Sequence, residues 1–249
     1  MNIALIGYGK MGHAIERHAT ARGHTVVSII DIGNTDDFDS EAFASADVAI
    51  EFTTPACGEE NCRRAMAAGV PVVSGTTGWS DRLPRLIRLC DDGHGTLLWS
   101  SNFSIGVNMF MHLNRYLARL MAPLPQYRPS MHEVHHVHKL DHPSGTALTL
   151  AAQILDNTPR IAAWTEDADV AAADPSQLVI THERRGEVPG LHSVSWTSPV
   201  DTITITHDAH SRDGFALGAV MAAEWLANKQ GYHTIDQFID ELIEHPTTI

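Results

Sequence analysis

The chain has 249 residues, 43% of them hydrophobic, so it is long enough for one large or two modest domains and too apolar to be disordered. Its formal net charge of −13 argues against nucleic acid and anionic membranes as partners. Three cysteines without a C-x-x-C spacing, no basic leader and no apolar stretch of about 18 residues predict a cytoplasmic protein without a membrane span.

The N-terminal segment predicts the first unit of a nucleotide-binding sheet. A buried strand over 2–6 leads into a glycine-rich turn, a helix that ends near Arg22, and a strand over 25–30 that is followed by Asp31. In such a unit the glycines let the backbone approach a pyrophosphate, and the acid binds ribose hydroxyls. The alternative is a glycine turn in a flavodoxin-like fold without a dinucleotide. The predicted cofactor-binding residues of the turn are Gly7, Tyr8, Gly9, Lys10, Met11 and Gly12.

The residues around Asp31 favour NADH over NADPH. Ile32 follows Asp31, so no arginine is present there for a 2′-phosphate, and the Asp31 carboxylate would repel that phosphate. Lys10 could compensate in part. We therefore expect NADH as the preferred cofactor, with NADPH as the alternative.

Alternating strands and helices continue to about residue 100. Strands are predicted over 47–52, 70–74 and 96–100, with a helix capped by Thr54 and ended by Gly69, and another over 81–90. This alternation predicts an α/β fold with a Rossmann-type doubly wound parallel sheet. The turns after the last two strands lie at the edge where such sheets bind ligands, although an ordinary turn and a core phenyl ring are the alternatives. The residues concerned are Gly75, Thr76, Thr77, Ser100, Ser101, Asn102 and Phe103.

The pattern changes after a long helix over 105–121. Strands are expected over 131–138, 178–184 and 192–207, a helix over 144–156, and two further helices over 215–226 and 235–243. We expect a dinucleotide-binding domain of residues 1–103 completed by 213–249. Residues 104–212 would form a second, α+β domain with a mixed, mostly open sheet.

The segment from His132 to Ala147 concentrates groups that bind and protonate an acid. It combines five histidines and Lys139 with a Ser144-Gly145-Thr146 turn that opens an apolar helix. Imidazole can transfer a proton near neutral pH, and a helix N-terminus offers N–H groups to a carboxylate. A metal site is less favoured, because His136 and His138 would share one strand face while His135 takes the other. Surface histidines around a loop are the remaining alternative.

The same segment resembles the signature of the dihydrodipicolinate (4-hydroxy-tetrahydrodipicolinate) reductase family. The resemblance covers most of the chain, because it extends to the glycine turn, to Gly75–Gly78, to Asn102–Asn108, and to a segment from Thr206 to Ala216 that includes Ser211-Arg212. It implies a reductase that transfers hydride to a cyclic unsaturated imine dicarboxylate in diaminopimelate and lysine biosynthesis. Another two-domain dehydrogenase and a non-catalytic NAD-sensing module are the rival interpretations.

The resemblance also implies roles for individual residues. His135, held as an imidazolium, would be the general acid, with Lys139 as its partner. His136, Ser144, Gly145 and Thr146 would bind the substrate. The second domain would assemble a homotetramer through its sheet. The nucleotide turn is one residue shorter than usual in the family, with Lys10 for an arginine, and Ile32 and Thr54 also stand where relatives carry arginine; these departures weaken the case for a 2′-phosphate pocket.

Overall fold

The computed structural model of the chain describes residues 1–211 and 213–245, which divide into two compact units. One unit comprises residues 1–105 and the C-terminal segment from Asp213, and the other begins at Gly106. Arg212, part of the quoted family resemblance, lies outside the described residues. None of the helices in the described ranges is long and apolar enough to cross a bilayer.

The first unit is built on a six-stranded parallel sheet with the order β11-β5-β4-β3-β1-β2. Its strands are β1 Asn2–Ile6, β2 Thr25–Ile30, β3 Val48–Glu51, β4 Val72–Ser74, β5 Thr96–Trp99 and β11 Gly231–His233. The chain runs outward from β1 to β2 and then in the opposite direction through β3, β4 and β5. The reversal beside β1 is the point where doubly wound sheets bind nucleotides at the carboxyl ends of their strands.

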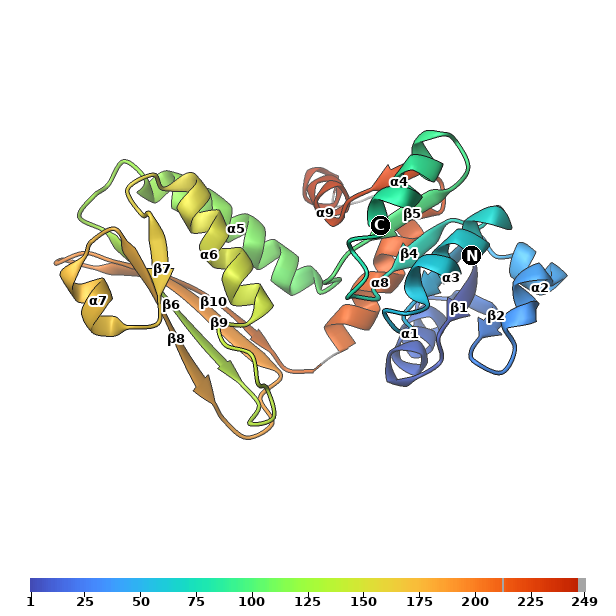
Figure 1. Cartoon of the computed structure of the whole chain (residues 1–249), viewed down its shortest axis with the longest axis horizontal. Helices are drawn as coiled ribbons and strands as arrows, with labels where there is room; N and C mark the ends of the chain where they lie inside the picture. Colours follow the sequence, from blue (N-terminus) through green and yellow to red (C-terminus); the bar gives the residue numbers. More distant parts are fainter. Residues whose placement is uncertain (212, 246–249) are drawn as a thin grey trace. The chain divides into compact units, whose positions relative to one another are not determined.

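Helices cover both faces of this sheet (Figure 1). They are α1 Lys10–Ala21, α2 Glu41–Ala44, α3 Gly58–Ala67, α4 Leu83–Asp91, α8 Asp213–Leu226 and α9 Ile235–Glu244, with the short 3-10 helix η1 Thr35–Asp39. Helix α8 packs on α1 and on β3, β4 and β5, whereas α3 and α4 pack together with the large side chains Phe43, Met66 and Trp79. Both faces are therefore dry, which explains why every residue of β3 and β4 is buried.

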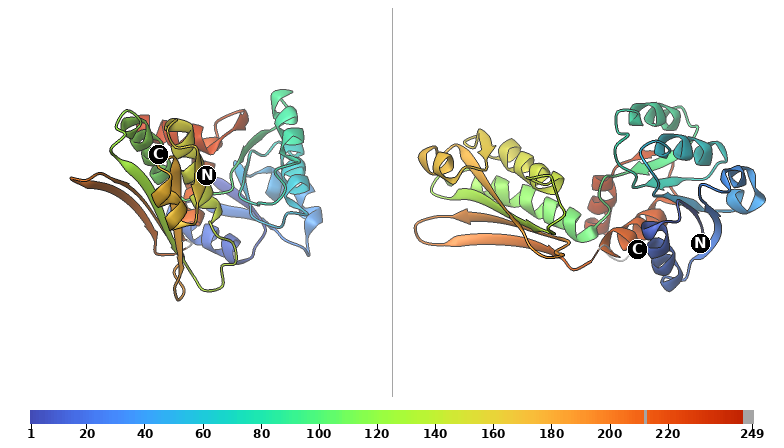
Figure 2. Two further views of the ribbon diagram at one scale, coloured as in Figure 1. Left: turned by 60° about the vertical axis from the view of Figure 1, so that its left-hand side comes forward. Right: turned by 60° about the horizontal axis from the view of Figure 1, so that its bottom comes forward.

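The second unit is a five-stranded mixed sheet covered by helices on one face (Figure 2). Its strands, in the order β10-β9-β6-β8-β7, are β6 Arg128–His135, β7 Ala163–Thr165, β8 Gln177–Arg184, β9 Gly190–Thr197 and β10 Thr202–Ala209. Strand β9 pairs antiparallel with β6 and β10, while β8 pairs parallel with β6 and β7. The helices are α5 Ile105–Met121, α6 Gly145–Asn157 and α7 Ala168–Ala173.

The apolar face of that sheet packs on α5 and α6 through a core that includes Phe110, Leu150 and Trp196. The other face is polar, because Ser195 and Thr204 pair across β9 and β10 at 2.9 Å, and His132 meets Thr181 across β6 and β8 at 2.8 Å. The parallel six-stranded sheet and the mixed, one-sided second sheet confirm the predicted fold class.

Three local predictions from the sequence are wrong. Thr54 does not cap α3; its carbonyl accepts the Cys57 and Gly58 N–H groups in a separate turn, and the helix begins at Gly58. Strand β6 ends at His135 rather than His138, because the next residues form a turn in which the Lys139 N–H bonds to the His136 carbonyl and the Val137 N–H to the Gly186 carbonyl. The segment over 192–207 is a hairpin of two strands, β9 and β10. The short elements η1, α2, α7, β7 and β11 have no strong hydrophobic period and were not predicted.

Candidate active site

The glycine turn after β1 leaves open space at the start of α1. Gly7 has φ +90°, and a Cβ there would lie 2.2 Å from the Phe52 carbonyl oxygen, while one at Gly12 would lie 2.4 Å from the Gly7 oxygen. At Gly9, by contrast, such a Cβ would have no atom of a described residue within 4 Å, apart from Gly9 itself and its two chain neighbours. Gly9 is the N-cap of α1 and supplies no capping side chain. The first-turn N–H groups are therefore available to an anion, and the turn fits a dinucleotide pyrophosphate.

The other predicted nucleotide residues lie in the same turn after β1, at the start of α1, and in the turns that follow β2, β4 and β5. Asp31 is exposed, and its carboxylate accepts the Ile32 N–H at 2.9 Å. Phe103 is only 1% exposed and lies against Phe52, which fits the core interpretation of its ring. Some of the remaining residues hold the turns in shape: Tyr8 bonds to Glu16, Ser100 Oγ accepts the Asn102 N–H, and Thr76 is buried. The others are exposed (Lys10, Thr77 and Ser101) or partly buried (Met11 and Gly75).

A buried carboxyl group that the sequence analysis missed joins two of these turns. Glu51 ends β3 and is fully buried, and it accepts hydrogen bonds from Ser74 at 2.5 Å and Thr76 at 2.8 Å, and from Thr53. Burial raises the pKa of Glu51 above its ordinary value, and the three hydroxyl groups oppose that effect. Glu51 therefore fixes the turns after β3 and β4 relative to each other.

An open cleft of about 830 Å³ also lies in the first unit, at the opposite edge of the sheet. It is lined by residues at the amino ends of β4 and β5, including Pro71, Gly95 and Thr96. Because ligands of doubly wound sheets bind at the carboxyl ends, we do not assign the cofactor to this cleft.

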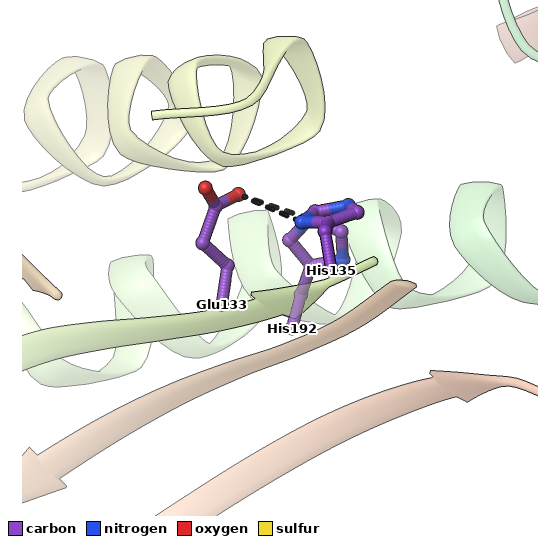
Figure 3. A group of neighbouring side chains, drawn as sticks. All are labelled: Glu133, His135 and His192. Carbon is purple, nitrogen blue, oxygen red and sulfur yellow. Dashed lines mark ion pairs between the residues drawn. The ribbon is translucent and has the colours of Figure 1, made fainter. Parts of the chain in front are cut away.

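In the second unit, Glu133, His135 and His192 form a buried cluster on the helix-covered side of the sheet (Figure 3). Glu133 and His135 are two residues apart on β6 and so share a face, and His192 projects from neighbouring β9. The Glu133 carboxylate lies 3.6 Å from His135 Nδ1 and 3.6 Å from His192 Nε2. Within the described residues, His135 Nδ1 has no hydrogen-bond partner.

The start of α6 completes this cluster. Ser144 is the N-cap of α6: its Oγ accepts the Ala147 N–H at 3.2 Å and contacts His192 Nε2 at 3.1 Å. Its own N–H donates to both Glu133 oxygens at 3.2 Å. Gly145 and Thr146 form the first turn of α6, where backbone N–H groups lack intrahelical acceptors. The Ser-Gly-Thr turn therefore opens a helix beside His135, as the sequence indicates.

Lys139 and Arg184 add positive charge at the edge of the cluster. Lys139 Nζ lies 2.8 Å from both carboxylate oxygens of Asp141. Arg184 donates to the backbone carbonyls of Lys139 at 3.1 Å and Asp141 at 2.7 Å, so it anchors the connection that carries Lys139. His136 is half-buried in the same connection.

The surroundings lower the pKa of both Glu133 and His135, which favours the charged form of the carboxyl group and the neutral form of the imidazole. Although burial opposes ionisation of Glu133, the neighbouring His192 ring and the hydrogen bonds from the Ser144 N–H outweigh it and lower the pKa to about 2. Burial lowers the pKa of His135 to about 4, and the charges of His192, Lys139 and Arg184 add to this effect while Glu133 opposes it. The lowered pKa opposes the expected imidazolium at His135 in the free chain and favours a neutral ring at neutral pH.

Three residues of this cluster were not predicted as site residues. Glu133 could have been found from its position two residues before His135 on the same strand face, and His192 from its place in the buried phase of an alternating strand. Arg184 carries no such signal, because only the parallel pairing of β6 with β8 brings it to His135. His136 and His138 lie outside β6, so they do not share a strand face. Strand alternation therefore gives no reason against a metal site at these two residues.

Comparison with known proteins gives a consistent result over both units. Residues 1–103 match the family model described as dihydrodipicolinate reductase, N-terminus, and residues 106–239 match the C-terminus model. A 4-hydroxy-tetrahydrodipicolinate reductase of Christiangramia forsetii is 43% identical over 98% of this chain and 100% of its own. One of Archaeoglobus fulgidus is 34% identical over 96% of this chain and its full length.

Solved structures agree on the fold. A dipicolinate-bound dihydrodipicolinate reductase from Paenisporosarcina sp. TG-14 has a TM-score of 0.73 and 21% identity, covering 94% of this chain and 97% of that one. A probable dehydrogenase from Thermotoga maritima has a TM-score of 0.56 and 8% identity, covering 96% of this chain and 92% of its own.

Proposed function

The chain belongs to the dihydrodipicolinate reductase family, and from that premise we propose how its residues carry out the reaction. It is an NAD(P)H-dependent oxidoreductase of diaminopimelate and lysine biosynthesis, which reduces the cyclic unsaturated imine dicarboxylate derived from 4-hydroxy-tetrahydrodipicolinate. The division of work among individual side chains, the choice of cofactor and the assembly are our proposals.

The domain of residues 1–103 and 213–249 holds the cofactor. The uncapped start of α1 would bind the pyrophosphate, and Asp31 the adenosine ribose. Gly75, Thr76, Thr77 and Ser100–Asn102 would border the nicotinamide, and buried Phe103 would support them through its contact with Phe52. Reduced nicotinamide, when bound, supplies the hydride. The exposed Asp31 carboxylate, followed by Ile32, disfavours a 2′-phosphate, and we propose NADH as the preferred cofactor.

The domain of residues 104–212 holds the substrate dicarboxylate. The first-turn N–H groups of Gly145 and Thr146 would bind one carboxylate, together with Ser144 and His136. Lys139, now paired with Asp141, would turn to the substrate's negative charge. The observation that carries this proposal is the juxtaposition of the α6 N-terminus, Lys139 and the buried His135.

His135 would donate the proton that completes the reduction. Its ring is neutral in the free chain, so it must gain a proton when the substrate binds. A dicarboxylate brings two negative charges beside a ring whose pKa is lowered to about 4 by burial and by the charges of its neighbours. That charge raises the pKa and couples substrate binding to proton uptake. Glu133 and His192 act as positioning residues, which hold the ring and the α6 N-terminus.

The proposed acid is tested by His135→Gln in an assay that generates the unstable substrate from pyruvate and aspartate semialdehyde with the preceding synthase. General acid catalysis is worth roughly 10²–10⁴-fold, so kcat should fall by that factor with little change in KM. The His138→Gln variant is the matched control, since His138 is exposed and pairs with Glu187. Full turnover by His135→Gln would refute the assignment.

Proton uptake on binding has its own test. Pyridine-2,6-dicarboxylate (dipicolinate), the ligand of the Paenisporosarcina structure, should raise the melting temperature of the NADH complex. Calorimetry in buffers of different ionisation enthalpy should register uptake of a proton at pH 7. Binding without proton exchange would contradict the coupling but leave the reductase assignment intact.

We also propose that the chain is a cytoplasmic homotetramer. None of the helices in the described part of the chain packs on the polar face of the second sheet, which includes the Ser195–Thr204 and His132–Thr181 pairs. This face offers hydroxyl groups for contact with another copy. Light scattering coupled to size exclusion would give the mass, and a monomer of 27.2 kDa would refute the assembly.

A further inference from the structure

A second histidine cluster lies in the same unit, apart from the residues assigned to the reduction. His142 Nδ1 and His182 Nδ1 both approach one oxygen, Oε1 of Glu166, at 2.9 and 3.1 Å. The two rings stack with centroids 4.3 Å apart and an angle of 20° between their planes. The side chains are 49%, 34% and 33% exposed for His142, His182 and Glu166, so an ion from solvent can reach them.

Two of the three spacings between the donor atoms are close to those that a zinc ion requires. All three lie within 4.8 Å of one another. A tetrahedral zinc ion with bonds of about 2.0–2.1 Å holds its ligand atoms about 3.3 Å apart. The two N···O distances of 2.9 and 3.1 Å need to lengthen by only a few tenths of an ångström, and the two nitrogens, which lie within 4.8 Å of each other, need to reach the same spacing. A small rotation of side chains on the surface is enough for that.

The donor types select the class of ion. Two imidazole nitrogens and one carboxylate oxygen suit Zn²⁺, Co²⁺ or Ni²⁺, whereas Mg²⁺ and Ca²⁺ prefer all-oxygen sites. Three protein ligands leave one position for water. We propose that His142, Glu166 and His182 form a binding site for a divalent transition-metal ion of the zinc class.

The position of these ligands gives the ion a consequence for the reaction. His142 belongs to the connection after β6 that carries Lys139 and leads into the Ser144 cap, while Glu166 follows β7 and His182 lies on β8. His182 is also the register partner of Glu133, which anchors the proposed active site. An ion at the cluster would add to the Arg184 bonds, tie the Lys139 connection to two strands and hold it in the arrangement in which Lys139 pairs with Asp141. Zinc should therefore inhibit reduction; this consequence, unlike the binding itself, rests on the proposed function.

The binding test uses the full-length chain and zinc chloride, followed by isothermal titration calorimetry. We expect one ion per chain, with affinity at least about 100-fold lower in His182→Asn and in Glu166→Gln, because loss of a direct ligand should exceed the 10–100-fold typical of an outer-shell partner. His138→Asn, which alters a histidine on the same connection that pairs with Glu187, is the matched control and should bind as the wild type does. Circular dichroism melting checks that each variant is folded.

Two results would overturn the site. One is equal zinc affinity in the wild type, His182→Asn and Glu166→Gln. The other is loss of binding in His192→Asn alone, which would place the ion in the buried Glu133–His135–His192 group instead. Binding of Co²⁺ to the wild type gives a second readout, since a four-coordinate site absorbs strongly in the visible range and an octahedral hydrated ion does not.

The inhibitory consequence is tested separately by the rate of NADH oxidation with and without zinc. Inhibition that is reversed by a chelator and absent in His182→Asn supports it. Stoichiometric binding without inhibition overturns the consequence and leaves the site. A chain that binds zinc but reduces nothing even in the absence of metal would refute the proposed function alone.

Discussion

Replacement of Glu133 by glutamine tests the electrostatics of the buried cluster. Glutamine keeps the size of the side chain and one oxygen for the Ser144 N–H, but it removes the negative charge beside His135, His192 and Arg184. Glu133 is 1% exposed, so solvent screens these interactions little. The variant should therefore be less stable than the wild type, by an amount that depends on pH.

The size of the effect follows from the pKa of Glu133. Its value is about 2 in the folded chain and 4.5 ordinarily, and at about 1.4 kcal/mol for each pH unit the difference corresponds to about 3 kcal/mol. Because the folded pKa is the lower one, this stabilisation is fully present above pH 4.5 and is lost as the pH falls towards 2. Wild type and Glu133→Gln should differ by about 3 kcal/mol at pH 7 and converge near pH 2.

Hydrogen exchange of the β6 and β9 amides is the suitable assay, because it reports opening of this unit without assuming that the whole chain unfolds in one step. Measurements at pH 7, 5 and 3 on the wild type and the variant give the difference at each pH. Glu183→Gln, which alters an exposed carboxylate on adjacent β8, is the control and should give a small, nearly constant difference. A Glu133→Gln difference that is the same at pH 7 and pH 3 would refute the reasoning.

Three further predictions concern the nucleotide-binding unit. Gly12→Ala should destabilise the chain, because its Cβ would lie 2.4 Å from the Gly7 oxygen, whereas Gly9→Ala should keep the wild-type melting temperature and weaken only NADH binding. Thermal melting and cofactor titration separate the two variants, and an equal loss of melting temperature in both would contradict the prediction. Asp31→Ala should weaken NADH binding about 10–100-fold, which corresponds to the loss of a charged hydrogen bond. It should also lower the ratio of kcat/KM with NADH to kcat/KM with NADPH; an unchanged ratio would argue against the role of Asp31 in ribose binding. Thr234→Ala should cost about 1 kcal/mol in urea unfolding, since it removes the capping box of α9.

The pH dependence of His135 complements these variants. Its folded pKa of about 4 lies below the ordinary 6.5, so folding opposes its protonation, and stability falls as the pH drops from 6.5 to 4. Because kcat/KM reports the free enzyme, it should fall with rising pH above about 4, while kcat should keep its value to a higher pH. A kcat/KM profile that stays flat until the alkaline range would point to an ammonium donor instead.

The sequence alone determined the elements whose pattern is local. The strand over 25–30 and the helix over 105–121 have the predicted bounds, because a continuous apolar run and a 3.6-residue period identify them without tertiary context. The glycine turn and the Ser144 cap were equally readable, since each needs only the chemistry of a few consecutive residues.

Only the tertiary structure decided what the site residues experience. His135 was predicted from its neighbours in sequence, but its neutral state depends on burial and on His192 and Arg184, which come from other strands. The two partners of Glu166 could not be predicted from the sequence either, because His142 and His182 reach it from distant parts of the chain. Charge–charge and desolvation energies depend on distances in space, and these are set by strand pairing rather than by separation along the chain.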